Sequence, residues 1–157
     1  MTTSTSATTR QQARAQACGE YARLNDEDSG FQAAFETAAG AAGRIAVLSR
    51  AVEASDRLAD LRPACGGRTR DVHRDQNRWR EQAALCRAAI RVEHARSAAA
   101  ERGLELPDPL GLPRATYIPR DSAAVVMAVF AEAYEQLAGW TPPQRGAADP
   151  AAEPGTR

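Results

Sequence analysis

The sequence contains no lysine, although it carries 20 basic residues, and all of these are arginine. A genome rich in G and C favours arginine and alanine codons over lysine codons, and this bias alone explains the absence of lysine. The arginine content is therefore weak evidence for nucleic-acid binding. Because 20 acidic residues bring the formal net charge to zero, the chain also lacks the overall charge that attracts proteins non-specifically to phosphate.

Large apolar side chains are scarce as well. Leu, Ile, Val and Phe together make up less than a fifth of the 157 residues, so any core must be thin. Most of the hydrophobic residues are alanines, which bury little area but favour helix more than any other residue. Strand-forming residues never alternate with polar ones over a useful length. This composition predicts an all-α protein whose helices pack closely through small side chains.

Segments that would direct the chain into a membrane or out of the cell are missing. Residues 1–10 contain no apolar stretch of the kind found in secretory signals, and the longest apolar run, residues 123–131, is too short to cross a bilayer. The three cysteines, Cys18, Cys65 and Cys86, are odd in number and have no paired spacing, which suits a reducing compartment. We therefore expect a cytoplasmic protein with no membrane partner.

Capping signals and apolar periodicity predict four helices within a single domain, residues 8–140. Thr8, Thr9 and Ser29 are each followed three positions later by Gln, the pattern of a capping box. The expected helices are 8–25, 29–62, 68–102 and 121–138, with a proline-rich strap, 104–120, that lies on the bundle. By composition, the leader 1–7 and the tail 141–157 are predicted to be disordered.

The two longest helices are expected to form an antiparallel hairpin. Pro63, Gly66 and Gly67 leave room only for a tight connection between them. Within the first of these helices lie Gly40 and Gly43, and each glycine costs about 1 kcal/mol of helix stability relative to alanine. This predicts either a kink or the close approach of a neighbouring backbone at that point. The short N-terminal helix and a short, buried C-terminal helix complete the four-helix architecture.

The predicted helix 68–102, which ends before a candidate C′ glycine at Gly103, carries two apolar stripes about 120° apart. The main stripe is Val72, Gln76, Trp79, Ala83, Cys86, Ile90 and Ser97, and the second is Leu85, Ala89 and Val92. Because both stripes are present only after Trp79, the C-terminal half should pack on two neighbours at once. Helix 121–138 is apolar on most sides, so it should be the most buried element.

The sequence carries no motif for catalysis, for a cofactor or for a metal. There is no GxSxG elbow, no phosphate-binding loop and no HExxH. Cys86 and His94 are eight residues apart, about 12 Å along a helix, which is too far to share a zinc ion. We expect Cys86 to be a core residue, while a metal site built across the hairpin from Cys65 stays an alternative. An enzyme is the least supported class, and no catalytic residue or cofactor is predicted.

One edge of helix 68–102 is basic, and we call it the basic strip: Arg80, Arg87, Arg91 and His94. These residues project within about 60° of one another around the helix, and no carboxylate of the same helix falls among them. Such an edge can pair with acidic residues of a partner helix, follow a phosphate backbone, or simply be solvated. Trp79 beside Arg80 can stack on a base, but its place on the main apolar stripe favours the core.

These observations predict a non-enzymatic helical interaction protein, an adaptor or assembly component that binds a protein partner through its hairpin and basic strip. Two long helices with one short covering helix leave apolar surface, so we expect a homo-oligomer, with a dimer favoured. The alternative is an accessory nucleic-acid-binding protein of a mobile element, phage or regulatory system that contacts phosphates through Arg80, Arg87 and Arg91.

Overall fold

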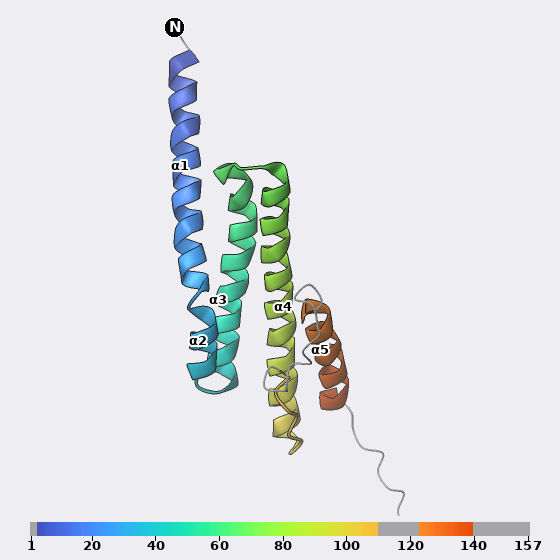
Figure 1. Cartoon of the computed structure of the whole chain (residues 1–157). Helices are drawn as coiled ribbons and strands as arrows, with labels where there is room; N and C mark the ends of the chain where they lie inside the picture. Colours follow the sequence, from blue (N-terminus) through green and yellow to red (C-terminus); the bar gives the residue numbers. More distant parts are fainter. Residues whose placement is uncertain (1–2, 110–122, 140–157) are drawn as a thin grey trace, which may run out of the picture.

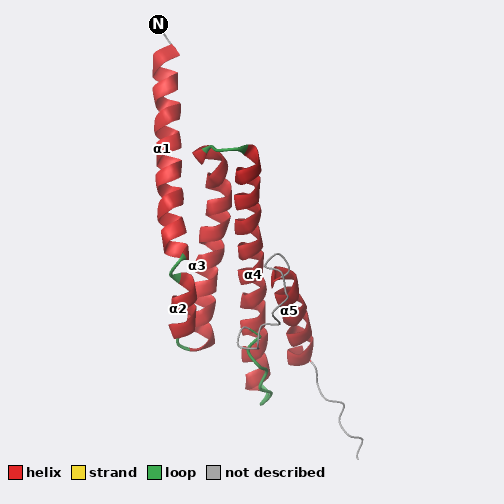
Figure 2. Cartoon of the chain, in the orientation of Figure 1, coloured by secondary structure: helices red, strands yellow, loops and turns green. Residues whose placement is uncertain are grey.

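The computed structural model describes residues 3–109 and 123–139, with the backbone alone for residues 3–6, and every element in these ranges is helical (Figures 1 and 2). The elements are α1 (Thr3–Asp28), α2 (Phe31–Thr37), α3 (Gly40–Leu61), the 3₁₀ turn η1 (Arg62–Cys65), α4 (Thr69–Glu101) and α5 (Ala123–Gly139). The predicted all-α class is confirmed. The predicted tail, 141–157, and most of the strap lie outside the described residues.

Helices α3 and α4 form the predicted antiparallel hairpin around η1 (Figure 1). Gly66 (φ +74°) and Gly67 (φ +117°) take up backbone conformations that other residues rarely adopt. The Arg62 guanidinium braces the connection, donating one hydrogen bond to the Gly66 carbonyl (2.7 Å) and another to the Asp75 carboxylate (2.8 Å). The tight turn predicted from proline and glycine is therefore confirmed.

Helix α1 is longer than predicted and is not a short helix. It has 26 residues and begins at Thr3, so the predicted leader 1–7 is helical from residue 3 onward. Thr8 and Thr9 lie inside the helix, and the predicted capping box is wrong. Once a helix exists, each added residue gains a hydrogen bond with no new nucleation cost, so α1 extends past these residues. Its first part projects beyond the hairpin turn (Figure 1), and side chains 7–16 are exposed.

The predicted continuous helix 29–62 is interrupted. Helix α2 ends at Thr37 and α3 begins at Gly40, and the two alanines between them are both extended (ψ 133° and 111°). Gly40 has φ +65°, a conformation that favours glycine, so the break occurs where the glycines predicted a kink. The Ser29 hydroxyl donates to the Asp26 carbonyl (2.6 Å). It thus closes α1, and the capping box predicted at the start of the second helix is wrong.

The core is thin, as the composition predicted, and just over half of its apolar residues are alanines. One cluster joins α1, α3 and α4 on the side of the hairpin turn, and we call it the turn-side cluster: Leu24, Ala54, Leu58, Ala59, Leu61 and Trp79. Trp79 is only 1% exposed and donates its indole N–H to the Tyr21 hydroxyl (3.0 Å). Its predicted place in the core is confirmed, so it is not available to stack on a base.

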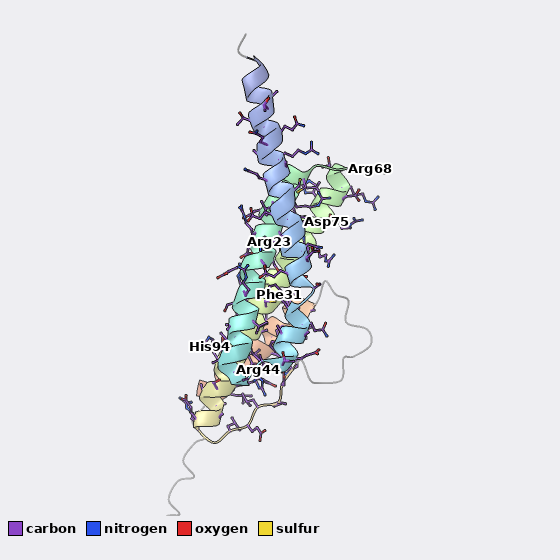
Figure 3. All side chains as sticks on the ribbon, turned by 90° about the vertical axis from the view of Figure 1, so that its left-hand side faces the viewer. Arg23, Phe31, Arg44, Arg68, Asp75 and His94 are labelled. Atoms are coloured by element: carbon purple, nitrogen blue, oxygen red, sulfur yellow. The ribbon has the colours of Figure 1, made fainter. Side chains whose placement is uncertain are left out.

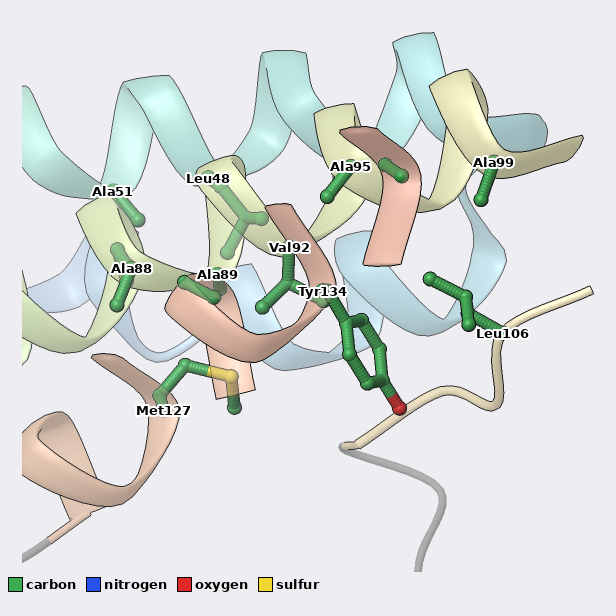
Figure 4. Close-up of a cluster of buried hydrophobic side chains, with 13 residues drawn as sticks. Leu48, Ala51, Ala88, Ala89, Val92, Ala95, Ala99, Leu106, Met127 and Tyr134 are labelled. Atoms are coloured by element: carbon green, nitrogen blue, oxygen red, sulfur yellow. The ribbon is translucent and has the colours of Figure 1, made fainter. Parts of the chain in front are cut away.

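A second cluster joins α3, the C-terminal half of α4 and α5 (Figure 4). Leu48 of α3 and Met127 and Tyr134 of α5 all belong to it, together with Val92 of α4. The prediction that this half of α4 packs on two neighbours is therefore confirmed. Small side chains on α4 allow both neighbouring helices to approach it closely.

Helix α5 runs parallel to α4 (Figure 1). This is possible because the chain turns back along α4 before α5 begins. The reversal starts at Gly103 (φ +77°). There the N–H groups of Gly103 and Leu104 donate to the carbonyls of Ala100 and Ala99, both at 2.9 Å. This arrangement is a Schellman motif, which confirms the predicted C′ glycine.

The first residues of the predicted strap lie on the bundle. Leu106 is buried, and its carbonyl accepts a hydrogen bond from Arg96 (3.0 Å). The Tyr134 hydroxyl of α5 donates to the Pro107 carbonyl (2.8 Å). These two hydrogen bonds tie the start of the strap to α4 and to α5.

Helix α5 is less buried than its composition predicted. Its side chains Met127 and Tyr134 face α4, but Val125 is 63%, Val129 62% and Leu137 42% exposed. The prediction that this helix is the most buried element is wrong. Among the helices of the described chain, α5 packs mainly on α4 and lies at one edge of the row (Figure 1), so its outer face remains uncovered by them.

Candidate functional site

All four residues of the basic strip are exposed on α4. However, Arg87 pairs with Asp56 of α3. Arg91 makes two hydrogen bonds to Glu135 of α5, at 2.8 and 2.7 Å. The fold thus brings to the strip the carboxylates that α4 itself lacks there. Because these two arginines are partly neutralised, the strip is less basic than the sequence indicated.

Arg80 and His94 are the two members of the strip that form no ion pair or hydrogen bond with other residues in the part of the chain that the structure describes. They are 14 positions apart on α4, which corresponds to about 21 Å along the helix. Figure 3 shows His94 well removed from the hairpin turn, where Arg68 is labelled. The two residues therefore lie far apart and do not form one continuous basic patch.

Arginine–carboxylate pairs join the helices elsewhere in the same way. Between α1 and α3, Arg57 binds Glu20 (2.8 and 2.9 Å) and Arg50 binds Glu27 (2.7 and 3.0 Å). These arginines lower the pKa of both glutamates below the usual range, chiefly through the hydrogen bonds. Each exposed pair contributes little stability. These pairs lie at the interfaces between helices, which indicates that many arginines bind carboxylates of neighbouring helices in the same chain.

A buried ion-pair cluster lies where α3, α4 and the start of the strap meet. Glu93 is 2% exposed and accepts hydrogen bonds from Arg44 (2.9 Å) and Arg96 (3.3 Å). These three residues line a shallow pocket of about 190 Å³, smaller than the roughly 300 Å³ at which ligand pockets usually begin. Because both arginines face the buried carboxylate, we assign the cluster a structural role.

The outer face of α5 is the largest feature that the sequence interpretation missed. Val125, Val129, Ala133 and Leu137 are all exposed and follow one another at every fourth position. We call this row the α5 ridge. Three of the four exposed large hydrophobic residues in the described chain belong to it. The signal was the apolar character of helix 121–138 on most sides, which indicates either full burial or an apolar face that binds something.

The ridge has an acidic border, because α5 contains Glu132 and Glu135 but no basic residue. Hydrogen bonds from Arg91 to Glu135 raise the pKa of the Arg91 guanidinium, and the nearby charge of Glu132 adds a smaller contribution. The acidic border of α5 therefore runs beside the basic strip of α4. A surface on which acidic residues lie beside basic residues can complement its own copy across a two-fold axis.

The predicted position of Cys86 in the core is confirmed. The residue is buried, and burial raises the pKa of its thiol to about 11. His94, by contrast, is exposed on α4. In residues 3–109 and 123–139, no three His, Cys, Asp or Glu side chains come together as a metal site would require. None of the helices in these ranges is long and apolar enough to cross a membrane.

Comparison with protein-family models, with curated proteins and with solved structures finds no match to this chain. The interpretation of its surface therefore rests on the physical chemistry of the exposed residues.

Asp28, the last residue of α1, is the one carboxyl group in the described helices whose pKa is clearly raised by burial. It accepts a hydrogen bond from Gln82, and Arg78 lies near enough to oppose the shift. Because its carboxylate is half-buried at the negative end of a helix dipole, its charge destabilises the fold at neutral pH. We expect Asp28→Asn, which keeps the acceptor for Gln82, to raise the thermal midpoint at pH 7 by up to a few degrees.

The gain should depend on pH in a defined direction. Because the pKa of Asp28 is higher in the folded than in the unfolded chain, Asp28 takes up its proton at a higher pH in the folded chain. The advantage of Asp28→Asn is then full above the raised pKa and is lost as the pH falls from the raised pKa to the unfolded value. Asp26→Asn, exposed and on the same turn, is the control for the helix dipole. A lower midpoint for Asp28→Asn at pH 7 would show that Arg78 stabilises the charge more than burial destabilises it.

Proposed function

We propose that the protein is a homodimeric helical interaction protein, and that two copies associate through their α5 ridges. The observation that carries this proposal is the exposure of Val125 and Val129, 63% and 62%, on a helix that packs mainly on α4. Fully burying a side chain of this size stabilises an association by about 1.5–3 kcal/mol. A second copy of the ridge supplies an apolar surface of the same length and shape.

The spacing and the charges of the ridge favour a second copy as its occupant. Residues at every fourth position form the ridge that packs against a like ridge at a crossing angle of about −50°, the most frequent class of helix packing. We expect a two-fold dimer to place the acidic border, which contains Glu132, beside basic residues on α4 of the other copy. There His94 has no partner within the described part of its own chain.

Such a dimer would serve as an adaptor or assembly component. Two copies joined at α5 would carry their hairpins outward on either side, and the first part of each α1 extends beyond the hairpin turn with its polar side chains exposed (Figure 1). Arg80 lies on the half of α4 nearer that turn, so it remains available to an acidic protein partner. The nucleic-acid alternative is disfavoured, because Arg87 and Arg91 are paired within the chain.

The proposal is tested by the mass of the protein in solution. The purified chain should have twice the 16.8 kDa of the monomer. Val125→Glu with Val129→Glu places like charges against each other at the ridge, which costs several kcal/mol. We expect the dissociation constant to rise at least about a hundredfold. Light scattering after size-exclusion chromatography, or sedimentation over a range of concentrations, measures the change.

A matched control separates dimerisation from general loss of apolar surface. Leu104 is 40% exposed but lies after α4, away from the ridge, so Leu104→Glu should leave the dimer intact. The circular dichroism of the doubly substituted chain should remain helical. A wild-type chain that stays monomeric over a 100-fold range of protein concentration would overturn the proposal. If the chain is monomeric and is stabilised only when a different protein binds the ridge, then that protein, and not a second copy, is the occupant of the ridge.

A further inference from the structure

Helix α1 reaches the hairpin turn at Cys65, where Arg14 contacts the backbone. The Arg14 guanidinium donates a hydrogen bond to the Cys65 carbonyl (3.2 Å). A side chain at the next residue, Gly66, would collide with the same guanidinium. The backbone of the turn and this face of α1 are therefore in direct contact.

Cys18 lies on that same face of α1. It follows Arg14 by four residues, and residues four apart are neighbours on a helix surface. Burial raises the pKa of the Cys65 thiol, and the Cys18 thiol lies near enough to add to that shift. Both residues are partly exposed, whereas Cys86 is buried. The fold has thus placed two partly exposed cysteines near each other, although 46 residues separate them in the sequence.

We propose that Cys18 and Cys65 form a disulfide that fastens α1 to the hairpin turn when the chain meets a low-molecular-weight disulfide such as oxidised glutathione. In the first step, one cysteine loses its proton and its sulfur attacks the glutathione disulfide, which releases one glutathione thiolate. In the second step, the other cysteine loses its proton and displaces the second glutathione. One S–S bond forms, one breaks, and the two electrons leave on two molecules of reduced glutathione.

The weak acidity of the Cys65 thiol favours a pair that stays reduced until oxidised glutathione is present. Burial and the neighbouring Cys18 thiol raise the pKa of the Cys65 thiol to about 11. Cys65 is therefore protonated near neutral pH, and only a thiolate attacks a disulfide. The reduced pair should persist in a reducing compartment and convert when oxidised glutathione accumulates.

The bond would act on α1, whose first part has no buried side chain among residues 7–16. Contacts of α1 with the hairpin that follow Cys18 include buried Leu24 and the hydrogen bond of Tyr21 with Trp79. Residues 7–16, which precede Cys18, are exposed. A disulfide at Cys18 fixes α1 at the point where it leaves the bundle. It also closes a long loop in the unfolded chain, which favours the folded state.

The test uses the full wild-type chain, incubated with oxidised glutathione, alkylated and digested with trypsin without reduction. Mass spectrometry should find the peptides 15–23 and 58–68 joined, two hydrogen atoms lighter than the free pair. The oxidised chain should melt several degrees above the reduced chain, and reductant should abolish the difference. Cys86→Ala, which removes the buried cysteine, should retain both the linked peptides and the rise in melting temperature.

Two single variants make the assignment specific. In Cys18→Ser and in Cys65→Ser, the remaining cysteine should accumulate as a mixed disulfide with glutathione, and oxidation should leave the melting temperature within about a degree of the reduced value. Separate glutathione adducts on Cys18 and Cys65 of the wild-type chain would overturn the proposal. So would linked peptides that occur only between two chains, as shown by a mixture of isotopically light and heavy protein.

Discussion

Replacement of Trp79 by alanine should lower the free energy of unfolding by about 3–5 kcal/mol. Trp79 is the largest side chain in the turn-side cluster, where it is 1% exposed and shares a cluster with fully buried Leu58. Its removal leaves a cavity that the surrounding alanines cannot fill, and it also removes the hydrogen bond to Tyr21. Since domains of this size are stable by only about 5–15 kcal/mol, Trp79→Ala should bring the chain close to unfolding.

Urea unfolding followed by circular dichroism measures this loss. Tyr21→Phe, which deletes only the hydroxyl that accepts the indole N–H, should cost about 1 kcal/mol. Trp79→Phe should lie between the two, because it keeps an aromatic ring in the cluster. If Trp79→Ala costs no more than Tyr21→Phe, then the turn-side cluster does not hold α1, α3 and α4 together.

Replacement of Glu93 by alanine should cost about 3 kcal/mol, the lower end of what is found when one partner of a buried ion pair is removed. The substitution leaves Arg44 and Arg96 facing each other without the carboxylate that both bind. The loss lies at the lower end because these two side chains are 26% and 21% exposed. Water therefore reaches both guanidinium groups and reduces the penalty.

Variants that remove one or both charges distinguish the effect of an unpaired buried charge from the effect of lost side-chain volume. Glu81→Ala changes an exposed carboxylate on the same helix and should alter stability by less than about 0.5 kcal/mol. Glu93→Leu combined with Arg44→Leu should cost less than Glu93→Ala alone, because removal of both charges leaves one fewer uncompensated group. If the double variant is less stable than Glu93→Ala, then the Arg44–Glu93 ion pair gives the fold a net stabilisation and does more than neutralise two buried charges.

Features governed by residues close together in the sequence were predicted well. Gly103 ends α4 in a Schellman motif, and the connection at Gly66 and Gly67 turns the chain back as an antiparallel hairpin. The break at Gly40 occurs where the glycines predicted a kink. Each of these features depends on the φ angle that a single glycine tolerates, so the sequence contains the whole cause.

Capping signals were less reliable, for a physical reason. Thr8 lies within α1, and the Ser29 hydroxyl bonds backward to Asp26. A hydroxyl stabilises a helix start only if the backbone leaves the helix there, and it bonds to a preceding carbonyl equally well. Whether the helix continues depends on the energy of its extension, which the capping residue alone does not decide.

The sequence by itself determined that the chain is helical, where its hairpin turns, and which half of α4 meets two neighbours. Those properties follow from local backbone preferences and from the 3.6-residue period of the apolar positions. Only the tertiary structure decided that the α5 ridge stays exposed, that Arg87 and Arg91 are paired, and that Cys18 lies near Cys65. Each of these depends on residues far apart in the chain, which only the packing of the helices brings together.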